Sequence, residues 1–129
     1  MDGGILVVHP EYRRGTLLML QVYSFAQRRW IHCDPCENAC DTPLMYESGW
    51  NKQISYVIAY SGEEVQDVTW RYSSDHKKVM ERRTECNENE LIDALISLRA
   101  KRQEVLSTSR RKYLTRRLVE ELCDLMLER

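Results

Sequence analysis

Apolar and polar positions divide the 129-residue chain into three regions. In residues 1–21, two continuous apolar runs, Gly4–Val8 and Thr16–Leu20, flank a polar stretch at Pro10–Gly15. Continuous apolar runs of this length are typical of short buried strands or of irregular buried segments, and they indicate no preferred face. The pattern therefore predicts buried backbone here without a defined orientation.

The region 22–72 has the pattern of β structure. Val22–Ser24 and Arg29–His32 are short β-prone runs on either side of a polar turn. Further along, Gln53–Tyr60 alternates between polar and apolar positions before it becomes apolar, and Val65–Trp70 follows it across a polar turn. Two such runs joined by a tight turn predict a hairpin.

Between these strands, Cys33–Gly49 is typical of a loop. It contains the two breaker pairs Asp34-Pro35 and Thr42-Pro43. A residue before proline is pushed toward extended or turn conformations, so neither a helix nor a long strand is expected.

The region 73–129 has helical periodicity. Ser74 or Asp75 can cap a short helix that ends near Arg83, Asn87 or Asn89 can cap a second, and Ser107 or Thr108 can start a third. Apolar residues recur at helical spacing on one side of the second and third helices. They are Leu91, Ile92, Leu95, Ile96 and Leu98 in the second helix, and Leu114, Leu118, Leu122 and Leu125, with Val119 and Met126 beside them, in the third.

Composition and charge narrow the function classes. Apolar residues make up 43% of the chain, which permits a real core, and 19 basic residues balance 20 acidic ones to a net charge of −1. This balance provides no general attraction to nucleic acid or to an anionic membrane, so we expect neither as a partner. The run Ile5–Val8 is too short for a signal peptide or a membrane span, so we expect an intracellular protein with reduced thiols.

The pair Cys33-x-x-Cys36, with Cys40 and His32 nearby, invites comparison with a zinc site. Structural zinc sites use two separated ligand pairs so that the backbone can wrap around the ion, and this spacing is too compressed. Neighbouring residues of a strand also point to opposite faces, which separates His32 from Cys33. We therefore favour buried or half-buried thiols over a metal site, and over a thioredoxin-type redox pair, because no helix follows Cys36.

The segment Arg99–Arg117 is rich in Lys and Arg. It could bind nucleic acid or an acidic protein. Because Leu and Val interleave with the basic residues at helical spacing, we favour the solvated faces of two amphipathic helices.

The most specific signal is a dense run of residues in the middle of the chain. It comprises Arg29–Glu37 and Asp41–Lys52, and it is followed by Ser55–Ala59 and Asp67–Tyr72. On these residues the chain resembles the transglutaminase-like core of the peptide:N-glycanases. The resemblance extends from about Val22 to the C-terminal helices.

This resemblance implies an α+β fold: a partial transglutaminase-like (papain-like) core with antiparallel strands and C-terminal helices. We accordingly divide the chain into a non-family N-terminal segment (1–21), a partial transglutaminase-like β region (22–72) and the C-terminal helical part of the core (73–129). The family removes N-linked glycans from misfolded glycoproteins in the cytosol by hydrolysing the glycan–asparagine amide. The resemblance thus implies a cytoplasmic location, an N-glycoprotein substrate and proteasome-shuttle proteins as partners.

The family chemistry uses a Cys-His-Asp triad, in which a thiolate attacks the amide and an imidazole transfers the proton. The resemblance places the triad carboxylate at Asp34. The His position falls on Leu17, which cannot transfer a proton, and the family's neighbouring Trp and Glu positions fall on Met19 and Gln21. The nucleophile should lie upstream, and residues 1–16 contain no Cys. We therefore expect a truncated, inactive form in which Asp34 is vestigial.

Glu37 and Trp50 match positions that the family uses around the chitobiose of the glycan, and Trp30 is a weaker candidate of the same kind. A carboxylate can accept hydrogen bonds from sugar hydroxyls, and an indole face can stack on sugar C–H groups. The alternative for these residues is packing in the core or at its rim. The family's structural zinc is held by Cys-x-x-Cys pairs upstream of the nucleophile, so we expect no cofactor and no metal site in this chain.

The resemblance begins abruptly at Val22, which we interpret as an alternative start, a retained intron or a faulty gene model. Two functions remain open. The chain is either a member of an amidase family by descent, or a non-catalytic fragment that binds glycan or protein, with 87–129 as a helical interaction surface. Loss of covering structure should also leave apolar area exposed.

Overall fold

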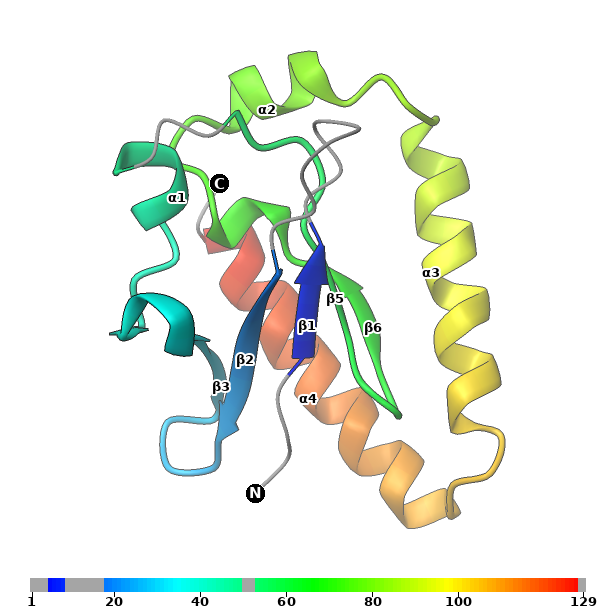
Figure 1. The fold of residues 1–129 in the computed structure, drawn as a ribbon. Coiled ribbons are helices and arrows are strands. Elements are labelled where there is room, and N and C mark those ends of the chain that lie inside the picture. Colours follow the sequence, from blue (N-terminus) through cyan, green and yellow to red (C-terminus); the bar gives the residue numbers. More distant parts are fainter. Residues whose placement is uncertain (1–4, 9–17, 50–52, 128–129) are drawn as a thin grey trace.

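The computed structural model describes residues 5–8, 18–49 and 53–127, and in these residues an antiparallel sheet of six strands is flanked by helices (Figure 1). The strand order is β4-β3-β2-β1-β5-β6. The strands are β1 (Ile5–Val8), β2 (Leu18–Ser24), β3 (Arg29–Asp34), β4 (Ala39–Cys40), β5 (Ile58–Tyr60) and β6 (Val65–Asp67). The helices are α1 (Met45–Ser48), α2 (His76–Arg82), α3 (Glu88–Gln103) and α4 (Thr108–Leu127), with 3₁₀ turns η1 (Pro35–Glu37) and η2 (Thr69–Arg71). This arrangement confirms the expected α+β class.

The described part of the N-terminal region belongs to the sheet. Strand β1 pairs with β2 on one side and with β5 on the other, so that Leu6 lies opposite both Leu20 and Tyr60. Strand β2 runs without a break from Leu18 to Ser24 and crosses the boundary at residue 21 that we expected between a non-family segment and the core. Of the two structures left open for the apolar runs, the strand is the one formed in the described residues.

Strands β2 and β3 contain the two β-prone runs expected around a polar turn and pair as a hairpin, with Arg28 of the turn at a φ of 54°. Burial alternates along β3, so Trp30, His32 and Asp34 are buried while the residues between them are half-buried. This alternation is expected for a strand that buries one face only. Tyr23 lies opposite Trp30. The buried face of the hairpin is therefore aromatic near the turn.

The predicted hairpin of residues 53–70 forms around the expected turn, where the Ser61 N–H donates to the Glu64 carbonyl at 2.8 Å. Its strands are shorter than predicted, because β5 begins only at Ile58 and β6 ends at Asp67. In the preceding segment Ile54–Val57 is buried at every position, and side chains satisfy part of its backbone, while the Val57 carbonyl accepts from the Val68 N–H. Arg82 donates to the Ile54 carbonyl, and the Val57 N–H donates to the Thr69 hydroxyl at 2.9 Å. Side-chain partners thus replace a sheet ladder that the sequence pattern predicted.

The segment 33–49 is not the loop that its breakers predicted, because it contains η1, β4 and α1. Strand β4 pairs with β3 through the registers Cys33 opposite Cys40 and Asp34 opposite Ala39. The prolines stand before or inside short turns, where a missing N–H costs nothing. The expectation failed because very short elements are compatible with breakers.

The three predicted C-terminal helices form, and their caps are those expected. The Asp75 side chain accepts from the Lys78 N–H at the start of α2, and the Asn87 side chain accepts from the Asn89 N–H at the start of α3. At the start of α4 the Ser107 hydroxyl accepts from the Arg110 N–H at 3.1 Å. None of the described helices is both long and apolar enough to cross a membrane.

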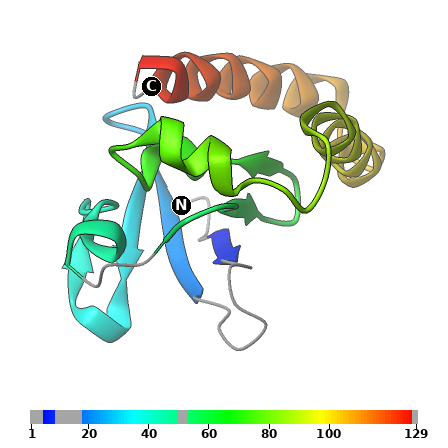
Figure 2. The same cartoon turned by 90° about the horizontal axis from the view of Figure 1, so that it is seen from above.

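Helix α4 packs against the buried face of the sheet, whereas α3 lies beside the edge strand β6 (Figures 1 and 2). Of the predicted apolar side of α4, Leu114 and Leu125 are buried and Leu118 is half-buried, whereas Leu122, Val119 and Met126 are exposed. Helix α3 has no buried residue, and its Ile92 and Ile96 are 53% and 58% exposed. A groove of about 860 Å³ with mainly apolar side chains lies between α3, α4 and β6. The expected apolar exposure thus lies on both α3 and α4, where Val119 and Met126 are 55% and 69% exposed.

The basic segment 99–117 has only in part the solvated surface that we favoured. Lys101, Arg111, Lys112 and Arg116 are exposed, but other arginines contact the β5–β6 hairpin. Arg102 donates to the Ser61 carbonyl, and Arg110 pairs with Glu63 at 2.8 Å. Arg117 is 4% exposed, pairs with Glu64 at 3.1 Å, and lies 3.8 Å from the centre of the Tyr23 ring. The β5–β6 turn supplies the carboxylates and carbonyls that these guanidinium groups need. The arginines therefore fasten both helices to the hairpin.

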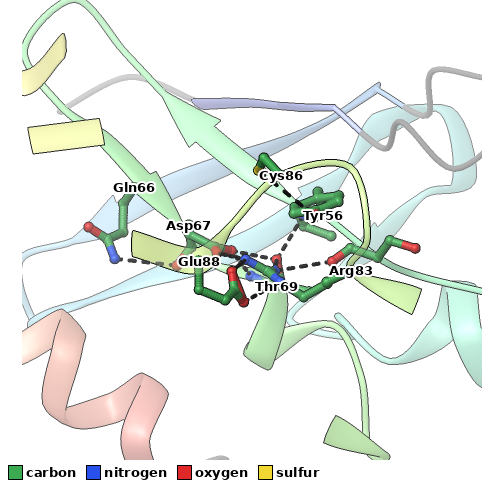
Figure 3. A network of polar contacts seen from close by, with 9 residues as sticks. Tyr56, Gln66, Asp67, Thr69, Arg83, Cys86 and Glu88 are labelled. Atoms are coloured by element: carbon green, nitrogen blue, oxygen red, sulfur yellow. Dashed lines mark hydrogen bonds and ion pairs between the residues drawn. The ribbon is translucent and has the colours of Figure 1, made fainter. Parts of the chain in front are cut away.

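Arg83 joins four elements through one buried guanidinium (Figure 3). Its side chain is 1% exposed and pairs with Asp67 at 2.6 Å and with Glu88 at 2.8 Å. It also donates to the Thr69 hydroxyl at 3.0 Å, and it lies 4.4 Å from the centre of the Tyr56 ring. Strand β6, turn η2 and the ends of α2 and α3 thus meet at a single charged group.

We predict that Arg83→Met destabilises the chain by about 3–5 kcal/mol, because the buried partners would lose their cation while staying desolvated. The matched control is Arg110→Met, which breaks a pair whose side chains are 31% and 33% exposed. Pairs near the surface contribute about 0–1 kcal/mol. Urea unfolding of the two variants checks the difference, and equal losses would contradict the structural role of Arg83.

Candidate functional site

The candidate site lies on the buried face of the sheet, at the end of β3. Asp34 is 4% exposed, and its Oδ2 atom accepts a hydrogen bond from the Tyr46 hydroxyl at 2.6 Å. Its Oδ1 atom accepts from the Glu37 N–H at 3.3 Å and so starts the turn η1. The carboxylate is therefore held on both oxygens by groups from its own neighbourhood.

Tyr46 is fully buried in the short helix α1, and the loop after η2 holds that helix in place. The Glu47 carboxylate accepts from the Ser73 hydroxyl, and from the Ser74 N–H at 2.9 Å and the Ser74 hydroxyl at 2.8 Å. Burial raises the pKa of Glu47, but these hydrogen bonds outweigh it and leave the pKa below its usual value. A charged Glu47 thus anchors α1 and directs Tyr46 toward Asp34.

His32 is the second polar group on this face. It is 1% exposed, and its Nε2 atom lies 2.7 Å from the Tyr46 hydroxyl oxygen. Because that hydroxyl donates its proton to Asp34, His32 must donate the Nε2 hydrogen, which fixes the neutral tautomer with an unprotonated Nδ1. The rings of Tyr46 and Tyr72 stand edge-on to the imidazole, with centroids 5.4 Å and 5.8 Å away.

Gln21 lies directly opposite His32 in the β2–β3 ladder and is fully buried. Its amide nitrogen donates to the Tyr72 hydroxyl at 2.8 Å. Its Oε1 atom and the Nδ1 atom of His32 are buried acceptors without a hydrogen-bond partner among the described residues. The face that holds Asp34 thus also contains two unsatisfied acceptors on facing strands.

Burial sets the protonation of the site. It lowers the pKa of His32 below 6.5, although Asp34 and Asp41 act in the opposite direction. It raises the pKa of Tyr46, and the hydrogen bond to Asp34 raises that pKa further. Burial likewise raises the pKa of Tyr72. Near neutral pH the site therefore contains a neutral imidazole and neutral phenols around Asp34.

The structure describes two of the four residues that the sequence singled out around the triad and the sugar, Glu37 and Trp30. Glu37 is exposed at the end of η1. Trp30 is 5% exposed, and its ring centroid lies 5.3 Å from that of Tyr23. These contacts favour packing in the core, and a sugar-binding role for Trp30 stays a prediction. Trp50 and Leu17 lie outside the described residues, and their roles also stay predictions.

The cysteine segment agrees with the separation expected from strand periodicity. His32 points into the core, whereas Cys33 is half-buried on the other face of β3. In the part of the chain that the structure describes, no group of three or more His, Cys, Asp and Glu side chains lies close enough to hold a metal ion. The side chain of Cys36 is outside that part.

Sequence reasoning did not assign roles to Tyr46, Tyr72 and Gln21 in the site. Tyr46 stands inside the dense motif, which was the available signal. Its bond to Asp34 joins residues 12 apart, and the Gln21–Tyr72 bond joins residues 51 apart. Contacts of that separation depend on how α1 and η2 fold back over the sheet, which a local pattern does not contain.

The antiparallel sheet with C-terminal helices, and the buried carboxylate at the end of β3, agree with the transglutaminase-like class that the resemblance implied. Residues 17–117 match the family described as the Rad4 transglutaminase-like domain. The chain belongs to this family, and the curated relatives that it matches are peptide:N-glycanases.

The relatives named peptide-N(4)-(N-acetyl-beta-glucosaminyl)asparagine amidase cover most of the chain. Those from Gallus gallus and Homo sapiens are each 53% identical over 104 residues, which is 81% of this chain and 16% of those proteins. The one from Drosophila melanogaster is 42% identical over 129 residues, which is 100% of this chain and 20% of that protein. The chain thus spans a fifth or less of these relatives. The division at residue 21 stays a prediction, although the Drosophila alignment continues through it.

We predict that His32 makes stability depend on pH. Its pKa is lower in the folded chain than the ordinary 6.5, so the unfolded chain binds the proton more readily. Stability should therefore fall as the pH drops through about 6.5, with a slope of at most about 1.4 kcal/mol per pH unit from this group. The variant His32→Gln keeps a donor for Tyr46 and should lose this part of the slope.

Urea unfolding at a series of pH values measures both slopes, and identical slopes for the two proteins would contradict the prediction. A direct check uses the wild-type chain alone. The imidazole NMR signals of His32 should titrate at a lower pH than those of a free histidine.

Proposed function

We propose that these 129 residues by themselves form part of a peptide:N-glycanase core and do not hydrolyse the substrate. The peptide:N-glycanase family removes N-glycans from glycoproteins by amide hydrolysis. The observation that carries this proposal is the 2.6 Å bond from the Tyr46 hydroxyl to Asp34 Oδ2. An imidazole N–H should donate to this carboxylate in a working triad. Here a phenol with a raised pKa takes that place, and a phenol of this kind does not transfer a proton near neutral pH.

The second requirement of the reaction is a thiolate beside an imidazole. Among the described residues, the Nε2 atom of His32 bonds to Tyr46 and its Nδ1 atom has no hydrogen-bond partner. The described thiols of Cys33 and Cys40 contact each other, and that of Cys86 contacts Tyr56. These contacts support the proposal, because no described thiol hydrogen-bonds to an imidazole that could activate it.

The resemblance supplies the setting of this proposal. It points to the cytoplasm as the location, to N-glycoproteins as the ligands and to proteasome-shuttle proteins as partners. The names of the curated relatives agree with the substrate class. In a longer chain that contained a nucleophile and an imidazole, the residues described here would contribute Asp34 and Glu37.

We predict that the purified chain releases no glycan from a denatured glycoprotein above the background of buffer alone. The full-length relative from Gallus gallus, run in parallel, should release it. Released glycan is measured by mass spectrometry, and the protein by its shift in gel mobility. Release by the 129-residue chain that disappears after alkylation of its thiols would contradict the proposal.

A second candidate function is glycan binding without cleavage. It is favoured by Glu37, which is exposed while its backbone N–H is fixed by Asp34. A carboxylate in a fixed turn can accept hydrogen bonds from sugar hydroxyls with little loss of conformational freedom.

For this candidate we predict that Glu37→Gln weakens binding of chitobiose by about tenfold, since a hydrogen bond to a charged group contributes about 1.5–3 kcal/mol. The control Glu81→Gln removes another exposed carboxylate, on α2, and should leave affinity unchanged. Titration calorimetry or ligand-observed NMR measures both. Equal affinities of the Glu37→Gln variant and the wild type would remove this candidate.

A further inference from the structure

Cys33 and Cys40 lie directly opposite each other in the β3–β4 pair, with their Sγ atoms 3.7 Å apart. Both are free thiols, and Cys33 is half-buried while Cys40 is exposed. A disulfide bond is about 2.05 Å long. The two sulfur atoms therefore need to move only a short distance toward each other to form a bond.

The register of β3 and β4 provides suitable backbone geometry. The Asp41 N–H donates to the His32 carbonyl at 2.7 Å, which makes these two residues a hydrogen-bonded pair of the ladder. Hydrogen-bonded and non-hydrogen-bonded pairs alternate in an antiparallel ladder, so Cys33 and Cys40 form a non-hydrogen-bonded pair, with Cα atoms typically about 4.5 Å apart. Disulfides join Cα atoms that are about 4.4–6.8 Å apart. Side-chain rotation can thus form the bond with little backbone movement.

The pair is also accessible from solvent. Strand β4 is the last strand in the sheet order, so no described strand lies beyond it. Cys33 is on the face of β3 opposite to His32 and Asp34, and that face is half-buried rather than covered. A small oxidant can therefore reach Cys40 without opening the core.

We propose that Cys33 and Cys40 are a reversible disulfide site, oxidised by a low-molecular-weight disulfide of the glutathione class. The Cys40 thiol releases its proton, and its thiolate attacks one sulfur of the oxidant, forming a mixed disulfide and releasing one glutathione thiolate. The Cys33 thiol then loses its proton and attacks the Cys40 sulfur. The Cys33–Cys40 bond forms, and the second glutathione thiolate leaves. The two thiolates take up the two protons, so two protein thiols are oxidised and one small disulfide is reduced to two thiols.

The environment of the two thiols determines this order. Burial raises the pKa of Cys33, and its contact with Cys40 raises that pKa further. Cys33 therefore stays protonated, and half-buried, while the exposed Cys40 meets the oxidant. Once the mixed disulfide has formed on Cys40, Cys33 is the adjacent thiol and completes the exchange.

The bond would close the segment that contains Asp34 and Glu37. Both residues lie between the two cysteines, and the Glu37 N–H already bonds to Asp34. Oxidation would thus constrain the turn that presents Glu37, without a change in the buried face. The site does not depend on the proposed glycanase relationship, because it follows from the register and the two thiols alone.

The test equilibrates the complete 129-residue chain with oxidised and reduced glutathione, stops the exchange with acid, alkylates the remaining thiols and maps disulfides by mass spectrometry. The wild-type chain should show a Cys33–Cys40 link and lose two alkylatable thiols, and dithiothreitol should restore both. Cys40→Ser should abolish the link. Cys33→Ser should accumulate a glutathione adduct on Cys40 at a level at least about tenfold above wild type, because the intramolecular step that removes the adduct is lost.

The controls use the other thiols of the chain. Cys86→Ser and Cys123→Ser remove exposed thiols elsewhere and should leave the Cys33–Cys40 link unchanged. Cys36→Ser should also leave it unchanged, which excludes a link formed through that residue. A wild-type chain that forms adducts on Cys40 but no link, or a link that is lost in Cys36→Ser, would overturn the proposal. Wild-type mapping decides this even if a variant fails to fold.

Discussion

The hydrogen bonds of the Tyr46 hydroxyl are the interactions on which the buried polar site depends. This hydroxyl lies between the two polar groups that β3 buries, donating to Asp34 at 2.6 Å and contacting the His32 Nε2 atom at 2.7 Å. A buried polar group without a partner costs about 1–3 kcal/mol, so both strand residues require this hydroxyl. Helix α1 is only four residues long; Tyr46 and Met45 pack in the core, and Glu47 holds the helix through Ser73 and Ser74 as well.

The same contact is the main support for the proposed lack of hydrolysis by these residues. The resemblance places the triad carboxylate at Asp34, and among the described residues its Oδ2 atom accepts from a phenol whose pKa is raised by burial. The neighbouring imidazole faces that phenol with one nitrogen and has a free acceptor at the other. A polar cluster in this state acts as part of the core. Two of its acceptors, His32 Nδ1 and Gln21 Oε1, have no hydrogen-bond partner among the described residues, and no described thiol hydrogen-bonds to the imidazole.

Charged groups also hold the helices against the sheet, a role that apolar packing usually has. Arg83 and Arg117 are buried, each pairs with carboxylates and each lies against aromatic rings. These guanidinium groups connect α2, α3 and α4 to the sheet across the β5–β6 hairpin. Polar side chains of α3 bind β6, and the apolar side of α3 therefore lines the groove. Strand periodicity meanwhile keeps Cys33 and Cys40 on the face away from His32 and Asp34, so the thiols and the buried cluster do not share an environment.

The sequence by itself determined the local elements and the family. The hairpin of β2 and β3, the turn at Ser61–Glu64 and the three capped helices follow from patterns within a few residues of each other, and the motif around Trp30 and Asp34 identified the class. Only the tertiary structure decided that β5 is shorter than predicted and that arginines of 99–117 bind the β5–β6 hairpin. It also decided that the Tyr46 hydroxyl donates a hydrogen bond to Asp34 Oδ2. Each of these depends on groups from different elements meeting over the sheet. A buried charge or hydroxyl bonds to whichever acceptor the fold brings within reach, and that acceptor is not encoded by its neighbours along the chain.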